Sequence, residues 1–113
     1  MADAGEYPPP WGTPEALVAM YNAETPPEIP AVTKLSPARR KKAKASLSFF
    51  PEQMFWRQVF EHITASTFLR GLRNTDGHMN FKADLDWLLT KGKDGSENCV
   101  KVFEGRYVDE GRM

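Results

Sequence analysis

The clearest hydrophobic pattern of the chain lies in residues 51–66, where apolar or small side chains recur at intervals of three and four. These positions, counted into the next turn, are Trp56, Val59, Phe60, Ile63 and Thr67. The positions between them are polar: Arg57, Gln58, Glu61 and His62. This spacing places the first set on one helix face and the second on the other. It predicts a central core helix with an outward polar face.

A short helix is predicted to start at Thr13-Pro14-Glu15. Threonine is a good N-cap, proline suits the first helical position, and glutamate is favoured near the positive helix end. The stripe that follows consists of Leu17, Met20 and Tyr21. The proline-rich segment after Thr25 is expected to end the helix and to form a kinked linker to about residue 33.

A second Ser-Pro pair, at Ser36, predicts another helix over residues 36–47. Its expected apolar face is thin and consists of Leu35, Ala38, Ala45 and Phe49. The remaining face carries five cations within six residues: Arg39, Arg40, Lys41, Lys42 and Lys44. The helix is therefore expected to be strongly basic on its solvent side.

The last third of the chain predicts shorter elements. A helix exit is expected at Gly71, because glycine takes positive φ readily, and residues 70–80 are expected to form a loop. Short helices are predicted over residues 84–91, capped by Asp84, and over residues 99–104, capped by the Ser-Glu-Asn segment before them. No convincing strand alternation occurs, so the expected fold class is a small all-α bundle of short helices.

Prolines divide the chain, since all of them except Pro51 lie in the first 37 residues. We expect residues 1–12 to form a disordered or extended proline-rich tail, residues 13–33 a short helix with its linker, and residues 34–109 the helical core domain. Trp11 within this tail has two equally weighted interpretations. Its ring either folds back onto the core or anchors a partner protein.

Composition narrows the class of protein. A chain of 113 residues has room for one domain, and its formal net charge of zero excludes a polycation or an acidic nucleic-acid mimic. The single cysteine cannot form an internal disulfide and fits a reducing, cytoplasmic setting. The N-terminus lacks a secretory signal pattern, and no apolar run approaches the roughly 20 residues that span a bilayer. We expect a soluble cytoplasmic protein without a membrane contact.

Residues that could carry chemistry are few and scattered. His62, His78 and Cys99 are too widely spaced for a zinc signature. Asp84 and Asp86 point to different sides of a helix, so a two-carboxylate site has little support. The glycines stand singly as turn residues and form no phosphate loop. The sequence predicts a non-enzymatic protein with no catalytic residue, metal site or cofactor.

The basic run is the feature with a physical mechanism behind it. Lysine and arginine side chains at 39–44 can contact phosphates and release counterions. The competing interpretation, given equal weight, is a solvated helix face paired with Glu52 or Asp109. An exposed ring of Phe49 or Phe50 beside the run would favour single strands, because bases stack on aromatic rings.

Four segments together resemble a known family. They are LSPARR, the block of residues 56–71 that ends in SxFLRG, the F-x-A-D-x-D-W-L-L box, and a V-x-E-G-x-Y ending. With the intervening order, they cover about residues 13–109. The chain resembles the C-terminal helical domain of bacteriophage and prophage replication initiation proteins, a group of replisome organisers and DnaD- or DnaT-like primosome proteins.

The resemblance implies a function in DNA replication initiation within a bacterial host cell. Domains of this type help to bring the replicative helicase or its loader to the origin, and related ones bind single-stranded DNA. The basic helix then becomes the candidate nucleic-acid face for single-stranded DNA or RNA. The implied core set is Trp56, Phe60, Phe68, Leu69, Phe81, Trp87, Leu88 and Tyr107.

An alternative follows from the N-terminal DNA-binding domain that the family usually carries and that this sequence does not contain. The chain is then expected to be either a fragment or a small stand-alone accessory protein of replication, or else a mobile-element inhibitor. The second possibility is an anti-CRISPR-like protein that binds and blocks a host nucleic-acid-guided nuclease, such as a CRISPR effector complex. Both possibilities act by contact, and neither requires an active site.

Partner binding is expected to involve loops, where a reused scaffold gains contacts. The candidate residues are Trp11, Arg70, Arg73, Asp76 and His78. Deleting residues 76–78 should therefore leave the helical circular dichroism spectrum and melting curve intact, while the capture of the partner falls. A deletion variant that fails to fold would show instead that this loop belongs to the scaffold.

Overall fold

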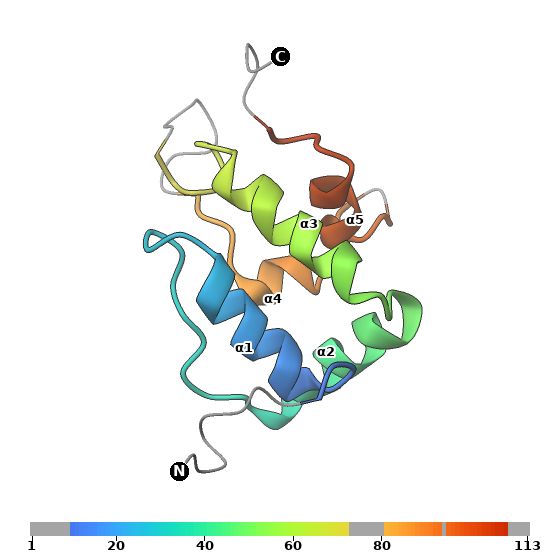
Figure 1. The fold of residues 1–113 in the computed structure, drawn as a ribbon. Helices are drawn as coiled ribbons and strands as arrows, with labels where there is room; N and C mark the ends of the chain where they lie inside the picture. The colour runs from blue at the N-terminus through green and yellow to red at the C-terminus, as the bar shows by residue number, and fades with distance from the viewer. Residues whose placement is uncertain (1–9, 73–80, 94, 109–113) are drawn as a thin grey trace.

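The computed structural model describes residues 10–72, 81–93 and 95–108. Within these ranges it contains five α-helices and no strand, which confirms the predicted all-α class (Figure 1). The helices are α1 (Pro14–Glu24), α2 (Pro37–Phe49), α3 (Gln53–Thr64), α4 (Leu85–Leu88) and α5 (Asn98–Phe103). The turn between α4 and α5 is closed by a single antiparallel bridge that joins Lys91 to Glu97.

The predicted helix starts are confirmed by their capping hydrogen bonds. The Thr13 hydroxyl accepts from the backbone N–H of Ala16 at 3.1 Å, and the Ser36 hydroxyl accepts from that of Arg39 at 3.2 Å. The Asp84 carboxylate accepts from the Trp87 N–H at 2.8 Å. Each bond satisfies one of the backbone donors that a helix leaves without an intrahelical partner at its N-terminus.

The last two helices differ from their predicted lengths and caps. α4 ends at Leu88, because the Thr90 N–H bonds back to Trp87 and the chain then turns into the Lys91 bridge. The predicted range of residues 84–91 was therefore too long. At the start of α5, Glu97 occupies the N-cap position and makes no side-chain capping bond.

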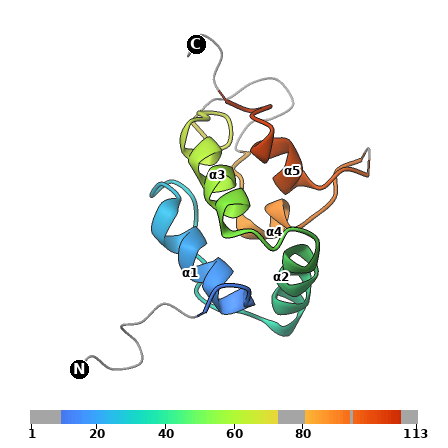
Figure 2. The same cartoon turned by 45° about the vertical axis from the view of Figure 1, so that its right-hand side comes forward.

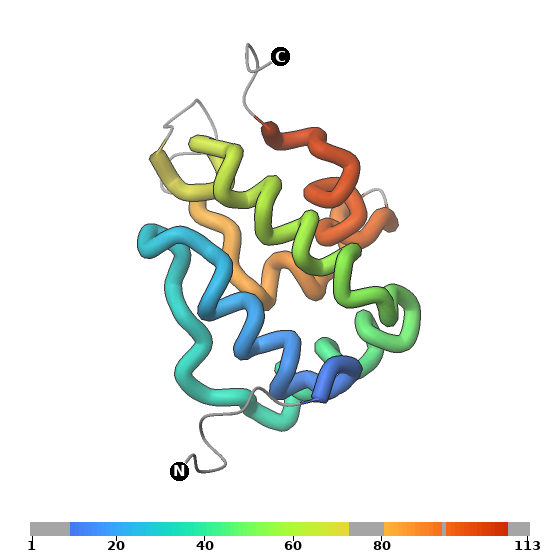
Figure 3. The backbone as a smooth tube through the Cα atoms, in the orientation of Figure 1, coloured from blue at the N-terminus to red at the C-terminus, as the bar shows by residue number. Residues whose placement is uncertain are grey.

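α3 is the centre of the core, as its periodicity predicts. It packs against α1 on one side and α5 on another, with α4 packed on α5 (Figure 3). The side chains of Trp56, Val59, Phe60 and Ile63 are fully buried. Leu17 and Tyr21 of α1 complete the same cluster, so α1 and α3 bury their apolar stripes against each other.

The buried face of α2 differs from the predicted one. Ala43 and Leu47 are buried, whereas Ala38, Ala45 and Phe49 are exposed. The inward positions recur every four residues and include Arg39 at the edge of the face. The sequence prediction failed because it treated arginine as an outward residue, although a long side chain can lie beside an apolar face while its guanidinium reaches a carboxylate.

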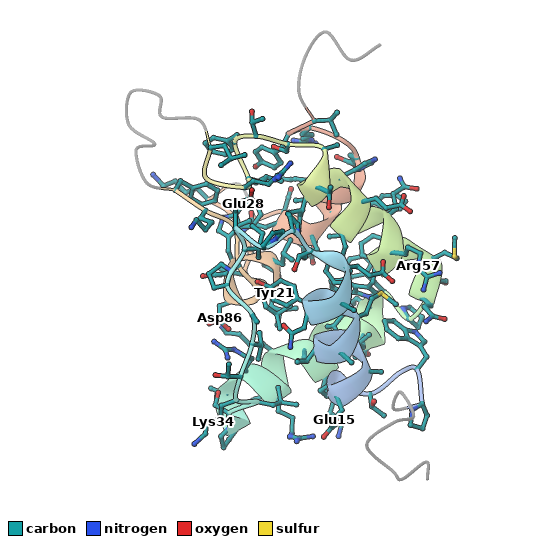
Figure 4. All side chains as sticks on the ribbon, turned by 60° about the vertical axis from the view of Figure 1, so that its left-hand side comes forward. Glu15, Tyr21, Glu28, Lys34, Arg57 and Asp86 are labelled. Carbon is teal, nitrogen blue, oxygen red and sulfur yellow. The ribbon has the colours of Figure 1, made fainter. Side chains whose placement is uncertain are left out.

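The proline-rich linker lies along α1 instead of running free of the core. The Tyr21 hydroxyl donates to the Pro30 carbonyl at 2.9 Å (Figure 4). The Asn22 amide both donates to the Val32 carbonyl at 3.0 Å and accepts from the Val32 N–H at 2.8 Å. Burial raises the pKa of Tyr21 to about 12, so this hydroxyl remains a donor at neutral pH.

Trp11 packs against the core, which corresponds to the first of its two interpretations. Its indole N–H donates to the Pro51 carbonyl at 2.7 Å and joins the start of the folded part to the turn between α2 and α3. The ring is half-buried and lines a recess with α1 and the beginning of α3.

Replacing Trp56 with alanine should lower the free energy of unfolding by about 3–5 kcal/mol, the range for truncating a large buried ring. Trp56 has no exposed surface, and its indole N–H donates to the Phe50 carbonyl at 2.8 Å. Urea denaturation followed by circular dichroism measures the change. Met54→Ala on the same helix is the control, since Met54 is exposed and should change stability by at most about 0.5 kcal/mol. A Trp56→Ala protein with wild-type stability would refute the core assignment.

Candidate nucleic-acid interface

The two arginines of α2 are held by carboxylates of neighbouring elements. Arg39 makes a bidentate pair with Asp86, in which Nε donates to Oδ1 at 2.9 Å and Nη2 donates to Oδ2 at 2.7 Å. A third bond runs from Arg39 Nη1 to the Lys34 carbonyl at 2.9 Å. Arg40 pairs with Glu15 of α1. The basic run therefore does have acidic partners, but they are not Glu52 and Asp109, which the sequence suggested. Asp109 lies outside the described residues.

The three lysines of α2 behave differently. Lys41, Lys42 and Lys44 are exposed, and none of them forms an ion pair with a described residue. At 100° per residue, Lys41 lies opposite the buried Ala43 and Leu47. α2 itself lies at the edge of the molecule (Figure 2). One side of this helix thus presents positive charge to solvent.

Phe49 extends this lysine face. It follows Lys42 by seven positions, which is two helical turns, so both side chains lie on the same flank of α2. The Phe49 side chain is 73% exposed. Lys44 lies on the opposite flank of α2, and Lys41 lies between the two flanks. We call these four exposed residues, Lys41, Lys42, Lys44 and Phe49, which together span the solvent side of the helix, the α2 lysine surface. It combines cations with an exposed aromatic ring, the condition under which the sequence favours single-stranded nucleic acid.

The ring of Phe49 is the outer member of an aromatic row. Its centroid lies 6.4 Å from that of Phe50. Phe50 stacks on Phe55 at 4.7 Å, and Phe55 stacks on Phe103 of α5 at 4.7 Å. This row packs beneath the turn between α2 and α3. Phe49 lies at its exposed end.

The electrostatics around α2 also distinguish its paired arginines from its exposed lysines. The hydrogen bond from Arg39 lowers the pKa of the Asp86 carboxyl below its ordinary value, and Lys42 contributes in the same direction. The same bond raises the pKa of Arg39. Asp86 and Glu15 thus neutralise the two arginines at neutral pH. Five cations facing two carboxylates leave an excess of three, which is carried by the lysines.

The five residues expected to bind a partner are not brought together as one surface. Arg70 Nη2 donates to Glu28 Oε2 at 2.9 Å, and Arg70 Nη1 donates to the Thr64 carbonyl at 3.3 Å. This arginine therefore ties the linker to the end of α3. Trp11 has its own core contacts. Arg73, Asp76 and His78 lie outside the described residues.

Two polar side chains of α3, which were predicted to face outward, are half-buried and contact α5. His62 Nδ1 lies 2.8 Å from the Val102 carbonyl, and Gln58 Nε2 donates to the Phe103 carbonyl at 3.2 Å. Both contacts arise because α5 crosses this side of α3. The prediction failed because α5 is short and distant in sequence. No residue near α3 in the sequence indicates that another helix packs on this side.

A buried serine and the candidate residue Cys99 have structural roles. Ser66 is buried, and its hydroxyl accepts from the Leu69 N–H at 3.1 Å. Burial raises the pKa of the Cys99 thiol to about 12, which keeps it protonated at neutral pH. Among the described residues, no group of three or more acidic, histidine or cysteine side chains is placed to hold a metal ion.

The structure also shows a feature that sequence reasoning missed. Phe68, Phe81, Trp87 and Tyr107 were all assigned to the core, yet each is only half-buried. Together they border a pocket of about 520 Å³. A weak signal was present, since none of these rings lies in a long helix and two lysines follow in the nearby turn and in α5.

Comparisons with known proteins found no matching family model, no matching curated protein and no matching solved structure. In the described part of the chain, no helix has the length and apolarity needed to cross a membrane.

The Arg39–Asp86 pair should make stability depend on acid pH. Since the folded pKa of Asp86 is lowered below 3.8, the carboxylate stabilises the fold above its unfolded pKa, and this contribution is lost as pH falls through the folded value. The Asp86 side chain is 49% exposed, so the expected loss in Asp86→Asn at pH 7 is about 0.2–1 kcal/mol. Urea denaturation of both proteins from pH 7 to pH 2 measures the difference. An equal difference at pH 2 and pH 7 would contradict the assigned ion pair.

Proposed function

We propose that this chain is a non-enzymatic module that binds single-stranded nucleic acid through the α2 lysine surface, in the setting of phage-type DNA replication initiation. The observation that carries the proposal is the exposed Phe49 ring on the same flank of α2 as the unpaired Lys42. An apolar ring exposed to solvent gains free energy when a partner surface covers it, and a nucleic-acid base provides such a surface.

The mechanism combines two contacts of different origin. Lysine ammonium groups contact phosphates and release counterions, which gives affinity without sequence preference. A base stacks on the Phe49 ring, which adds binding energy that does not depend on salt. Three lysines make few phosphate contacts, so the expected affinity is modest, and it falls with ionic strength with a slope of only about two in log K against log salt.

The composition of the surface favours single strands over sequence-specific duplex binding. Outward positions of α2 are occupied by lysine, alanine, serine and phenylalanine. Base edges are read by arginine or lysine at guanine and by asparagine or glutamine at adenine, and α2 contains no asparagine or glutamine. In α2 the arginines are engaged by Asp86 and Glu15. A base must be unstacked to lie on Phe49, and single strands offer such bases at little cost.

The replication setting rests on the resemblance to the helical tail domains of phage replication initiation proteins. In that setting the replicative helicase or its loader is the protein partner, and the module holds a single strand close to it. The predominantly helical fold and the described binding surface are compatible with this role, which requires contact and not catalysis.

Changing Lys41, Lys42 and Lys44 to alanine should weaken binding to a dye-labelled oligothymidylate and flatten its salt dependence. Loss of three phosphate contacts lowers the slope of log K against log salt by about two, at roughly 0.7 per contact for a single strand. Fluorescence anisotropy over a salt series measures both quantities. The matched control is Lys82→Ala with Lys91→Ala, which removes two exposed lysines outside α2.

Phe49→Ala tests the stacking contact in the same assay. It should cost about 1–3 kcal/mol of binding, the value of one stacked base, and should leave the salt slope unchanged. Its stability should remain close to wild type because the ring is exposed. If the triple-lysine variant binds as tightly as the control variant, the α2 lysine surface is not the interface and the proposal fails.

A further inference from the structure

The pocket that sequence reasoning missed is separate from the α2 lysine surface. Its lining residues come from the turn after α3, the segment before α4, α4 itself, the turn at residues 91–97, α5 and the turn that follows α5 (Figure 1). They are Phe68, Phe81, Trp87, Lys93, Asn98, Lys101 and Tyr107. None of them belongs to α1 or α2. We call this recess of about 520 Å³ the aromatic pocket.

Four rings form a closed circuit around the aromatic pocket. Phe68 stacks on Phe81, with centroids 4.9 Å apart and planes 16° apart, and on Tyr107 at 5.9 Å and 18°. Trp87 meets Phe81 edge-on at 5.5 Å and meets Tyr107 edge-on at 5.9 Å. Stacked and edge-on pairs of this kind are favourable and fix each ring by its neighbours. The walls are therefore flat, aromatic and set in place before a ligand arrives.

The polar side chains of the aromatic pocket are cationic or neutral. Lys93 is exposed on the turn between α4 and α5, and Lys101 lies on α5. Among the described lining residues there is no carboxylate. The turn that carries Lys93 is closed by the Gly92 N–H, which donates to the Ser96 carbonyl at 2.8 Å. Positive charge is thus held at the mouth of an aromatic recess.

Asn98 supplies a polar group inside the pocket. The residue is only 5% exposed, and its Nδ2 donates to the Trp87 carbonyl at 2.9 Å. This bond joins α4 to α5 and fixes the backbone that carries Trp87. It engages the amide nitrogen only, and the oxygen of the same carboxamide is a hydrogen-bond acceptor. A buried amide of this kind can orient a ligand that has N–H or O–H groups.

We infer that the aromatic pocket binds a nucleotide. A planar base fits against aromatic walls, and a phosphate monoester carries negative charge that the exposed Lys93 can neutralise. The volume lies within the range of small-molecule sites, which is roughly 300–1,000 Å³. An uncharged aromatic ligand would make no use of the charge of Lys93, and an inorganic anion would make no use of the rings. The inference goes beyond the α2 lysine surface, since the two sites share no residue.

The test is calorimetric titration of the full chain with adenosine 5′-monophosphate, adenosine and inorganic phosphate. Saturable binding of the monophosphate is expected, and adenosine should bind about ten-fold more weakly because it lacks the charged hydrogen bonds. Inorganic phosphate should show no saturable binding in the same range. Lys93→Ala should weaken binding of the monophosphate about ten-fold, the equivalent of one charged contact. Lys91→Ala removes an exposed lysine two positions away and should bind like wild type.

Two further arms locate the ligand and its source. Amide chemical shifts in the nuclear magnetic resonance spectrum should move at Lys101 and Tyr107 and not along α2. A 5′-phosphorylated oligothymidylate that competes with the monophosphate, when its unphosphorylated form does not, assigns the pocket to strand ends. Failure of both oligonucleotides to compete assigns it to the free nucleotide. Either result supports a nucleotide site.

The result is distinguishable from that of the α2 experiment. The variant with Lys41, Lys42 and Lys44 changed to alanine should bind the monophosphate as wild type does, whatever its affinity for oligonucleotides. Absence of saturable monophosphate binding to the folded wild-type chain would overturn the inference, as would binding that Lys93→Ala leaves unchanged. An acidic peptide with an aromatic C-terminus that binds at the pocket, while the monophosphate does not, would also overturn it and reassign the pocket to a protein partner.

Discussion

The bidentate contact between Arg39 and Asp86 fixes the orientation of α2 together with the burial of Ala43 and Leu47. α2 buries only Ala43 and Leu47, and a buried leucine contributes about 1.5–3 kcal/mol. A helix with so small an apolar anchor has few constraints on its rotation. Rotation in either direction would carry Arg39 away from Asp86 and would bring a lysine toward the core. The exposed position of the lysines is therefore a consequence of how the arginines are held.

This contact also explains the most specific motifs of the chain. In LSPARR, Ser36 caps α2 and Arg39 reaches into the F-x-A-D-x-D-W-L-L box, where Asp86 receives it and Asp84 caps α4. Two segments that are about fifty positions apart thus form one structural unit. The motif residues therefore stabilise the fold. The exposed residues of the proposed binding surface, such as Lys42 and Phe49, lie outside these motifs. A resemblance based on these motifs consequently says more about the fold than about the ligand.

Local signals predicted the fold well, and long-range contacts limited the prediction of the site. The strong period of α3 and the caps of α1, α2 and α4 are properties of neighbouring residues, and the structure confirms them. The covered position of His62 depends on α5, forty positions later. The aromatic pocket depends on Phe68, Trp87 and Tyr107 arriving from three separate segments. These contacts join residues that are far apart in the sequence, so local periodicity does not indicate them. From periodicity alone, the aromatic rings could be assigned only to a core.

The division of labour between arginine and lysine explains how a chain of zero net charge can present positive surfaces. In the described part, Arg39, Arg40, Arg57, Arg70 and Arg106 each pair with a carboxylate. The planar guanidinium suits such pairs because it offers several donors in a fixed fork, whereas the lysine ammonium is compact and strongly hydrated. Five carboxylates are thus engaged by arginines, while Lys41 and Lys42 on α2 and Lys93 at the pocket remain at the surface. Net charge counts both groups equally, but a phosphate approaching the surface meets mainly the lysines.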